Sequence, residues 1–572
     1  MAGSTRRAFL TTLGTLGFIG LGAGTGTAMT TDGHSSKSTV SANPTFTEID
    51  GIESFIDAVM SKRIGTEIPG ASVAIVEGSD PVLAKGYGYA DMNSGTPVQA
   101  DETTFEAGSV GKLVTWTAVM QGVQDGLLDL DEDVNTYLDN SDVQVPDAYE
   151  DPITLRHLGT HTSGLESALA PAVVDTPDQL TSLETVLVER RPERVRPPGK
   201  AVGYSNYGAA LAGHMVAETY DTPFEEHVQS TIFEPLDMSH STFAQPVPEE
   251  RPGTLAASHR RDGSEFITAE PVYINMWPAG SMTATATDMA TFMSAHLGDG
   301  SVDDTRILES DTVATMYSQH YERHPAVNNW RYGFYEYGHP DGDVIAHSGG
   351  TIYQESQLAL APQHDIGIFV NYNLRTDDEE SLAVIDEILE EYNLQPDSTT
   401  PISTSESGGK QRAETVTDEY GLTMLPQNGP LKSLDSLSRV SVEAAGDGRL
   451  LSKTLDGSRE WVEIDPYVYQ EQDGNDVLAF DIVDGEVAAM HESSLPQNTY
   501  RSVPFHERQL VTGGVLGVSL SGFVLSILGW GGHYAYRQWR HDRTATGATT
   551  MEPSTGEPTQ VTESGNDEEG CA

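Results

Sequence analysis

Cysteine, lysine and long apolar runs are all scarce in this chain of 572 residues. Its one cysteine, Cys571, is followed only by Ala572, which excludes an intrachain disulfide, a cysteine metal cluster and a C-terminal prenylation box. Acidic residues outnumber Lys and Arg by 86 to 32, which gives a formal charge of −54. A chain this acidic repels phosphate backbones, so nucleic-acid binding is excluded as a function class.

The basic residues include only eight lysines, and the acidic charge is spread along the chain. This composition is typical of proteins that work in very high salt. Salt near 1 M shortens the Debye length to about 3 Å and so screens the repulsion between acidic side chains. We therefore expect a salt-adapted source, with an acidic protein from an ordinary cell as the alternative.

The N-terminus carries a candidate export signal. Arg6 and Arg7 precede Phe9-Leu10 and a mildly apolar, Gly-rich stretch, a pattern typical of twin-arginine signals. We predict such a signal over residues 1–28 and a Ser/Thr-rich spacer over residues 29–46. A chance Arg pair at a frayed end is the alternative.

A run without charged residues, 510–532, lies near the C-terminus. At about 1.5 Å per residue it reaches roughly 34 Å, which matches a hydrocarbon core of about 30 Å. Arg537, Arg540 and Arg543 follow, so the positive-inside rule places the acidic tail, 533–572, in the cytoplasm. The sequence thus predicts a cell-membrane protein with one C-terminal span and an extracellular catalytic domain. A buried core helix is the alternative for this run.

Residues 47–395 are predicted to form the first of two domains. Apolar runs at 71–76 and 82–87 indicate a hairpin, and those at 355–360 and 366–372 indicate a second strand pair. The middle, 105–300, is mainly helical in pattern, and 380–393 reads as an amphipathic helix. We predict an α/β (α+β) fold, in which one antiparallel sheet joins both strand pairs, helices flank it, and a cleft separates it from a helical lobe.

A polar linker, 396–413, leads to the second predicted domain, 414–505. Short alternating runs such as Trp461-Val462-Glu463-Ile464 are separated there by Asp/Gly turns. This pattern predicts a small antiparallel β domain.

The first of three candidate motifs is Ser109-Val110-Gly111-Lys112, at the start of an apolar helical pattern. Residues three apart share a helix face, so the Ser109 hydroxyl and the Lys112 amine are expected to be neighbours. Lys can remove the proton of a serine only when neutral. Lowering its pKa from about 10.4 to about 7 takes about 4–5 kcal/mol, which burial can supply. A second copy, Ser407-Gly408-Gly409-Lys410, lies in the predicted linker and is interpreted as chance because no helix is expected there.

The second motif is Tyr204-Ser205-Asn206, which follows Pro197-Pro198-Gly199 and precedes a helical run. A tyrosine beside a lysine can act as a general base, and the asparagine amide can bond both Lys112 and a substrate amide. Tyr273-Ile274-Asn275 has the same spacing, but it lacks the Pro-Gly lead-in and the helix.

The third motif, His347-Ser348-Gly349-Gly350, follows the apolar Val344-Ile345-Ala346 and is expected on or at the end of a strand. Small residues there let a substrate backbone approach. A backbone N–H after the glycine pair could join that of Ser109 in an oxyanion hole.

In this order and context the three motifs resemble the serine β-lactamase and penicillin-binding protein family, in its class C β-lactamase, D,D-carboxypeptidase and esterase branch. The resemblance covers about residues 50–395. The segments ITLRHL at 153–158, HTSGL at 161–165 and PAGSM at 278–282 are similar to the family's scaffold. The unit at 414–505 resembles the small β domain that some members carry.

The resemblance implies a role for each residue. Ser109 is the expected nucleophile, Lys112 and Tyr204 share the proton transfers, and the N–H groups of Ser109 and Gly350 form the oxyanion hole. Asn206, His347 and Gly349 are the expected substrate-positioning residues. No metal and no cofactor is expected.

The sequence departs from the family pattern at two places. His347 stands where many true β-lactamases have Lys. Family members with His at this position include D,D-peptidases and esterases. The stretch Thr351–Glu355 lacks the Pro-Gly-Phe pattern that the family leads us to expect.

The predicted function is an exported, membrane-anchored serine hydrolase acting on a small ester, amide or peptide. A true β-lactamase and a non-catalytic surface binding module with the same fold are the alternatives. His157 and His161 have an i,i+4 spacing that can bind zinc, but Leu158 stands where a metalloprotease has Glu, so we expect a structural role.

Overall fold

The computed structural model describes residues 49–546 apart from 140, 167–172, 339–343, 377–379, 395–407, 429–431, 433–434, 436–437 and 456. The predicted signal and spacer, 1–28 and 29–46, lie outside the described residues, as do most of the linker and the end of the tail. The chain divides into two compact units, one ending at Val503 and the other beginning at Pro504.

The N-terminal domain, predicted at residues 47–395, is built on a seven-stranded antiparallel sheet that joins strands from both ends of the domain, as predicted. The first hairpin turns at Gly78-Ser79, and its leading strand pairs with the last strand of the second pair, with Val73 opposite Val370. The sheet order is β13 (Tyr335–Tyr337), β14 (Val344–Gly350), β15 (Glu355–Ala361), β16 (Ile366–Tyr372), β1 (Gly70–Glu77), β2 (Asp80–Asp91), β3 (Thr96–Pro97).

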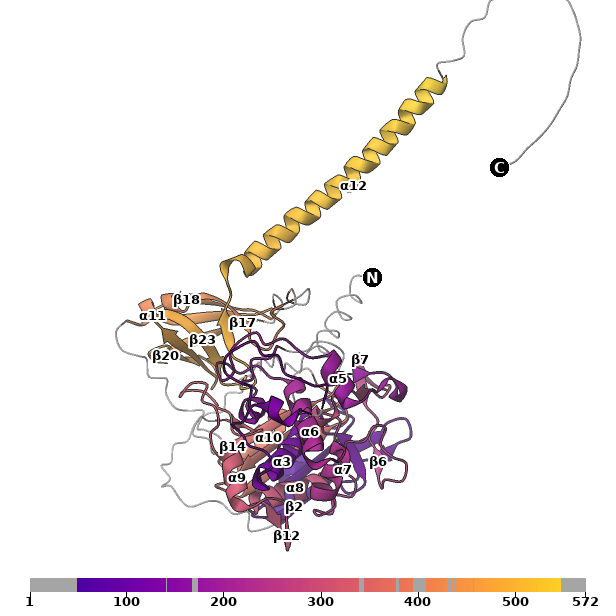
Figure 1. Ribbon diagram of the computed structural model, residues 1–572, viewed down its shortest axis with the longest axis vertical. Helices are drawn as coiled ribbons and strands as arrows, with labels where there is room; N and C mark the ends of the chain where they lie inside the picture. The colour runs from indigo at the N-terminus through magenta and orange to yellow at the C-terminus, as the bar shows by residue number, and fades with distance from the viewer. Residues whose placement is uncertain are drawn as a thin grey trace, which may run out of the picture. The chain divides into compact units, whose positions relative to one another are not determined.

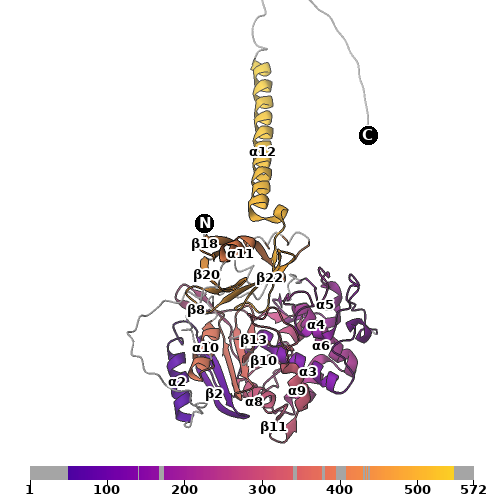
Figure 2. The same cartoon turned by 90° about the vertical axis from the view of Figure 1, so that its left-hand side faces the viewer.

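The sheet separates two apolar cores because successive side chains of a strand point to opposite faces. Val73 and Ile75 of β1 face the core that contains α2 (Ile49–Ser61) and α10 (Glu380–Glu391), whereas Ala74 faces the core of the helical lobe. Figure 2 shows α2 and α10 on one side of the sheet and α3, α6 and α8 toward the other. Helices on both faces explain why β15 and β16 are buried along their whole length.

The helical lobe lies between β2 and β13 in the chain and carries the first two motifs. Short strand pairs interrupt it, among them β4 (Thr103–Glu106) with β10 (Thr283–Ala284) and β6 (Thr254–Leu255). Its helices are α3 (Gly111–Gln124), α4 (Leu155–Gly159), α5 (Leu183–Glu189), α6 (Asn206–Tyr220), α7 (Phe224–Val228), α8 (Ala286–Leu297) and α9 (Ser310–Tyr317).

The predicted small β domain is a closed barrel in which each strand pairs with its neighbours (Figure 1). Closure leaves no free sheet edge. Trp461, Tyr469 and Phe480 of the barrel belong to the same apolar cluster as α2 and α10, so the barrel and the N-terminal domain form one compact unit. The strands are β17 (Asp418–Leu422), β18 (Val440–Gly446), β19 (Arg449–Lys453), β20 (Ser458–Asp465), β21 (Val468–Glu471), β22 (Val477–Val483), β23 (Glu486–Glu492) and β24 (Tyr500–Ser502).

The end of the predicted linker differs from the expectation. Helix α11, Gly409–Thr415, begins inside it and packs on the barrel, so Lys410 is helical rather than part of a flexible segment. Gly408 makes this start possible, because its φ of +111° is open to glycine but strained for other residues.

The second unit contains one long helix, α12 (Gln509–Thr546), which runs through the predicted membrane span and into the predicted tail. Within the residues that the structure describes, no helix is both long and apolar enough to cross a membrane.

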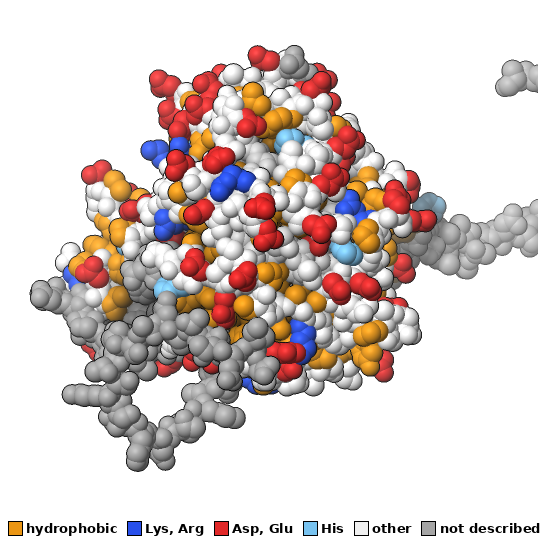
Figure 3. All heavy atoms as spheres, turned by 90° about the horizontal axis from the view of Figure 1, so that it is seen from below, with side chains coloured by type: hydrophobic (Ala, Val, Ile, Leu, Met, Phe, Trp, Pro, Cys, Tyr) orange, Lys and Arg blue, Asp and Glu red, His pale blue; other side chains and the backbone are white. Residues whose placement is uncertain are grey.

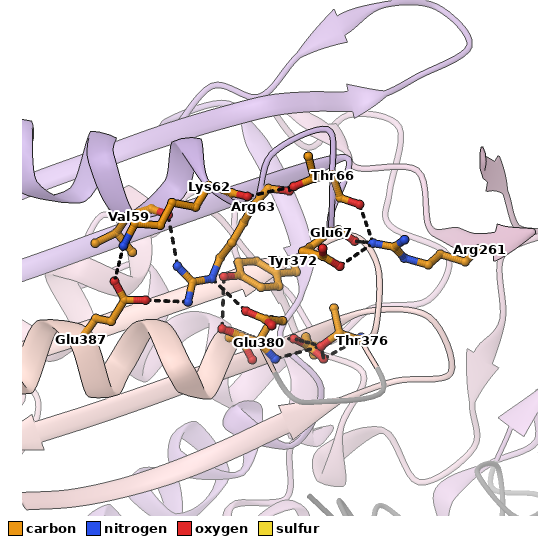
Figure 4. A network of polar contacts seen from close by, with 12 residues as sticks. Val59, Lys62, Arg63, Thr66, Glu67, Arg261, Tyr372, Thr376, Glu380 and Glu387 are labelled. Carbon is orange, nitrogen blue, oxygen red and sulfur yellow. Dashed lines mark hydrogen bonds and ion pairs between the residues drawn. The ribbon is translucent and has the colours of Figure 1, made fainter. Parts of the chain in front are cut away.

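A polar network connects the two ends of the N-terminal domain (Figure 4). The buried Arg63, after α2, donates to Glu380 Oε2 at 3.0 Å and to Glu387 Oε1 at 2.7 Å on α10. The nearby pair between Arg261 and Glu67 is more exposed. The first network fixes α10, whose N-terminus borders the pocket described below.

The surface carries the acidic charge that the composition implies. Figure 3 shows Asp and Glu side chains scattered over the described part of one face, with fewer Lys and Arg between them. Scattered charge of this kind is what the prediction of salt adaptation rests on.

Candidate active site

The first motif places its serine and lysine side by side. Ser109 lies on a single 3-10 turn, Gly108–Val110, directly before α3, and Lys112 lies in the first turn of that helix. Lys112 Nζ is 2.9 Å from Ser109 Oγ and 2.5 Å from the Ala279 carbonyl oxygen. Only 3% of Ser109 and none of Lys112 is exposed. The scaffold segment at 278–282 thus contributes a direct contact of the lysine.

Burial opposes the charged form of Lys112. It lowers the pKa of Lys112 well below its ordinary value, because an ammonium group is poorly solvated there. A neutral Nζ has a lone pair, so it can accept the proton of Ser109. The placement also puts Nζ 5.1 Å from the centre of the Tyr204 ring.

The second motif brings Tyr204 to the same point from the N-terminus of α6. Ser205 caps the helix, and its backbone N–H donates to His161 Nδ1 at 3.1 Å. The rings of His161 and Tyr204 are 4.2 Å apart. Burial raises the pKa of Tyr204 above its ordinary value, and its hydrogen bond with Ser109 opposes that shift. Tyr204 is therefore a neutral phenol near pH 7, which makes Lys112 the better base.

Asn206 lies at the first position of α6, and its Oδ1 atom is buried without a hydrogen-bond partner in the described chain. The predicted bond between Asn206 and Lys112 is not formed. Asn206 also does not line the pocket that contains Ser109.

The third motif occupies β14 and lies against the turn that carries Ser109. A Cβ on Gly108, whose φ is +53°, would be 2.7 Å from the backbone nitrogen of Gly350. A Cβ on Gly349 would be 2.3 Å from the Ala107 carbonyl oxygen. Only glycine fits at these positions, because the two backbones touch. The backbones of Ser109 and Gly350, the predicted oxyanion pair, are thereby brought together.

His347 is buried behind this contact and does not line the pocket. Its Nδ1 is 2.7 Å from the Ser348 carbonyl oxygen, so Nδ1 carries a proton, and its Nε2 has no partner in the described chain. Burial and the nearby Lys112 lower the pKa of His347 to about 3. His347 is therefore neutral, and it supplies no cation for a substrate carboxylate.

The stretch that departs from the family pattern is fixed by the half-buried carboxyl group of Glu106. Thr351 Oγ1 donates to Glu106 Oε2 at 2.5 Å, and Gln354 Nε2 donates to Ser258 Oγ at 3.0 Å. Burial raises the pKa of Glu106 above its ordinary value. Sequence reasoning did not single out Glu106, although it lies only three residues before Ser109.

A pocket of about 320 Å³ opens onto Ser109 and Tyr204. Its wall includes Ser348, Gly349 and Gly350 of the third motif, and Glu355 and Arg375 farther along the sheet. Several wall residues were not predicted, namely Asn328, Tyr335, Tyr337, Gly338, Gln357, Leu382, Asp386, Asn475, Asp476 and residues 493–498. Those at 475–498 belong to barrel turns, and nothing in their local sequence indicates that they face the serine.

The competing motif copies serve other purposes. Tyr273-Ile274 forms β9, and Asn275 Oδ1 accepts from the Thr181 N–H at 3.0 Å. Lys410, on α11, is 81% exposed. Neither copy lines the pocket at Ser109.

The histidine pair does not form a metal site. His157 Nδ1 accepts from the Thr154 N–H at 3.2 Å and so caps α4, whereas His161 supports Tyr204. No cluster of three or more His, Cys, Asp or Glu that could hold a metal occurs among the described residues.

Comparison with known proteins places this arrangement in a family. The family model described as Beta-lactamase matches residues 53–392. Protein flp of Staphylococcus aureus (strain N315) is 26% identical over 315 residues, which are 54% of this chain and 60% of that protein. A protein named Beta-lactamase from Yersinia enterocolitica is 26% identical over 290 residues, which are 50% of this chain and 69% of that protein. The chain thus spans about 60% of the length of the flp relatives that it matches.

Solved structures show the same fold over a larger share of the chain. The crystal structure of SurE matches with a TM-score of 0.57 and 18% identity, covering 80% of this chain and 99% of that one. The octameric penicillin-binding protein homologue from Pyrococcus abyssi matches with a TM-score of 0.50 and 20% identity, covering 79% and 99%. These identities show the fold alone. Because the family model matches more than half of the sequence, the chain belongs to the Beta-lactamase family.

Proposed function

We propose that the protein is a serine hydrolase that cleaves a small ester, amide or peptide bond through an acyl-enzyme on Ser109. The observation that carries this proposal is the 2.9 Å contact between Ser109 Oγ and Lys112 Nζ, an amine whose pKa is lowered well below its ordinary value by burial. A nucleophile needs such a base within hydrogen-bond reach.

The geometry supports one assignment of the proton transfers. Lys112 Nζ takes the proton of Ser109 as Oγ attacks the substrate carbonyl carbon. The backbone N–H groups of Ser109 and Gly350 stabilise the oxyanion. The phenol of Tyr204 then protonates the leaving group as its bond to the carbonyl carbon breaks, and the Lys112 ammonium restores the phenol proton. Water then attacks the acyl-enzyme. Its proton passes through Tyr204 to Lys112, and the Lys112 ammonium returns a proton to Ser109 Oγ as the ester bond breaks and the acid is released.

A covalent probe tests the nucleophile directly. The purified chain is treated with a fluorophosphonate in molar salt, and its intact mass is measured beside Ser109→Ala. We expect one adduct on the wild type and none on the variant. A folded wild type without an adduct contradicts the proposal and favours the non-catalytic binding module.

The substrate class within the family follows from two further probes. A neutral His347 supplies no cation for a carboxylate, which favours ester or peptide cleavage over β-lactam hydrolysis. We expect the protein to hydrolyse a short p-nitrophenyl ester faster than a chromogenic cephalosporin. The reverse order of rates supports a true β-lactamase.

The location of the protein is a separate proposal that rests on the sequence. Arg6 and Arg7 suggest export, the run 510–532 suggests membrane attachment, and the charge of −54 suggests a salt-adapted source. Fractionation of the native host tests the first two, since a chain recovered in the soluble cytoplasm contradicts both. Thermal unfolding in rising KCl tests the third, and a melting temperature that does not rise with salt contradicts it.

A further inference from the structure

A turn of the barrel pairs with the segment that carries Tyr204. The turn connects β23 to β24 and contains Pro496 and Gln497. The Tyr204 N–H donates to the Gln497 carbonyl oxygen at 3.2 Å, and the Thr499 N–H donates to the Val202 carbonyl oxygen at 3.1 Å. On the other side, Trp330 Nε1 donates to the Pro496 carbonyl oxygen at 2.7 Å. The turn is therefore bonded to the hydrolase domain through its backbone.

Arg323 fixes both ends of this turn. Its guanidinium donates to the carbonyl oxygens of Glu492 at 3.2 Å and Asn498 at 2.8 Å, and also to that of Asn328 at 3.1 Å. Only 4% of Arg323 is exposed. A cation buried this deeply is tolerated only when it is hydrogen-bonded, so the bonds to the turn are strongly favoured.

The side chains of the turn face the pocket that holds Ser109. Residues 493–498 line it together with Asn475 and Asp476 of the β21–β22 turn. Gln497 Nε2 donates to Ser348 Oγ at 3.4 Å, so this side chain reaches the third motif itself. The barrel thus supplies one wall of the pocket, and the hydrolase domain supplies the other.

Both walls carry hydrogen-bonding side chains among apolar ones. The barrel side contributes Asn475, Gln497 and Asn498, and the other side contributes Tyr335 and Tyr337, with the Tyr337 hydroxyl donating to Asp386 Oδ1 at 2.6 Å. Leu382, Leu495 and Pro496 are the aliphatic members of the lining that the structure describes. A fatty acyl chain would remove these polar groups from water without bonding them, at a cost of about 1–3 kcal/mol for each group left unpaired. A peptide chain can bond them.

We propose that the turn at 493–498 selects substrates with a peptide-like acyl part, with Gln497 as the specificity-determining residue and Arg323 as a positioning residue. This inference rests on the proposed function, because it concerns the substrate of Ser109. The acetyl group of a small ester is too short to extend along this wall, whereas an N-acylated dipeptide extends along it.

Two esters with the same leaving group test this proposal on the full chain. They are p-nitrophenyl acetate and the p-nitrophenyl ester of N-acetyl-alanyl-alanine, made with L- and with D-alanine. We expect Gln497→Ala to lower kcat/KM for the better dipeptide ester, mainly through KM, by at least tenfold more than it lowers kcat/KM for the acetate. Gln472→Ala is the matched control, because Gln472 is an exposed barrel glutamine outside the pocket lining. Arg323→Lys keeps the charge but loses the fork geometry, and should shift the ratio of the two rates in the same direction.

The two proposals fail in different ways. Equal losses on both esters, or no loss on the dipeptide ester, overturn the role of the turn while hydrolysis of the acetate upholds the proposed function. If the wild type hydrolyses neither ester and takes up no fluorophosphonate, the proposed function fails. In that case the role of the turn is tested by calorimetry, which measures the Kd of the dipeptide ester for Ser109→Ala. A tenfold weaker Kd in the Gln497→Ala double variant supports it, and an unchanged Kd overturns it.

Discussion

The two ends of the pocket differ in charge. At the inner end, Lys112, Tyr204 and His347 are buried, and burial opposes the charged form of each: it lowers the pKa of Lys112 and of His347 and raises the pKa of Tyr204. At the outer end, Arg375 and Asp476 line the wall, and Asp476 is paired with Arg459 at 2.8 Å. A chain with a formal charge of −54 therefore has its nucleophile at a point almost free of charge.

The two ends of the pocket therefore serve different steps: proton transfer at the inner end and substrate recognition at the outer end. Proton transfer between Lys112 and Ser109 needs a low dielectric, which lowers the pKa of the amine. Recognition of a polar substrate needs hydrogen-bonding groups in contact with water, which exchange partners at little cost. The acidic surface affects neither directly, since salt screens exposed charges over about 3 Å near 1 M.

The largest effect is expected at the inner end. Ser109→Ala and Lys112→Met should each lower kcat/KM for p-nitrophenyl acetate by about 10⁴-fold or more, because each removes a member of one proton-transfer unit. Lys410→Met, in the other copy of the S-x-x-K spacing, is the control and should change nothing. Steady-state rates with active-site titration check this, and a Lys112→Met variant with more than a tenth of the wild-type rate contradicts Lys112 as the base.

The second largest effect is expected at the backbone contact between Gly108 and Gly350. Gly108→Ala places a Cβ 2.7 Å from the Gly350 nitrogen, which displaces the predicted oxyanion hole. We expect about a 10²- to 10³-fold loss of kcat, the usual effect of losing an oxyanion donor.

Gly78→Ala is the matched control for that change. Its φ of +66° resembles that of Gly108, but a Cβ there meets nothing within 4 Å. Both variants should lose about 1 kcal/mol of stability from the left-handed backbone, and only Gly108→Ala should lose activity. Equal activities in the two variants contradict a steric role for the Gly108–Gly350 contact.

The pH dependence of the inner end should follow Lys112. Because burial lowers its pKa, kcat/KM should rise about tenfold per pH unit below that pKa and become flat above it, well under the usual lysine value of about 10.4. Tyr204 ionises only at a higher pH than an ordinary tyrosine, because burial raises its pKa. A profile that rises only above pH 10 contradicts a neutral Lys112. The stopped-flow acylation rate of Ser109 checks this step.

The inner end was predicted from the sequence, whereas most of the outer end was not. Ser109 and Lys112 are three residues apart on one helical turn, so their contact follows from local geometry. The sheet likewise follows from apolar runs such as 366–372. Gln497 reaches the pocket only because a barrel turn pairs with residues 202–204, nearly 300 positions earlier, and no local pattern encodes such a contact.

Two expectations were wrong because tertiary contacts prevailed over local ones. The helix α11 occupies the end of the predicted linker since Ala413 packs against the barrel, which compensates for the weak helix start at Gly408-Gly409. The bond predicted between Asn206 and Lys112 is absent, because Lys112 is directed to Ser109 and Ala279 instead.

The smallest effect concerns stability at the outer end. Glu355 lines the pocket and accepts from the Thr376 and Ser381 backbone N–H groups at 3.0 and 3.1 Å, and burial raises its pKa to about 7. Between about pH 4.5 and 7 the folded state therefore holds a proton that the unfolded state has lost, so the unfolding free energy falls as the pH rises. Glu355→Gln should remove about 2 to 3 kcal/mol of this fall, measured by chemical denaturation at pH 5 and 7.5.

Glu387→Gln, on α10, is the control of opposite sign. Although burial opposes it, the hydrogen bond with Arg63 lowers the pKa of Glu387, so its contribution is present above about pH 4.5 and is lost as the pH falls below that value. The two variants should therefore change the pH dependence of stability in different windows and opposite directions. If Glu355→Gln leaves the slope between pH 5 and 7.5 unchanged, Glu355 is ionised in the folded protein. The outer end of the pocket then carries one more negative charge, and its difference from the inner end is larger than described above.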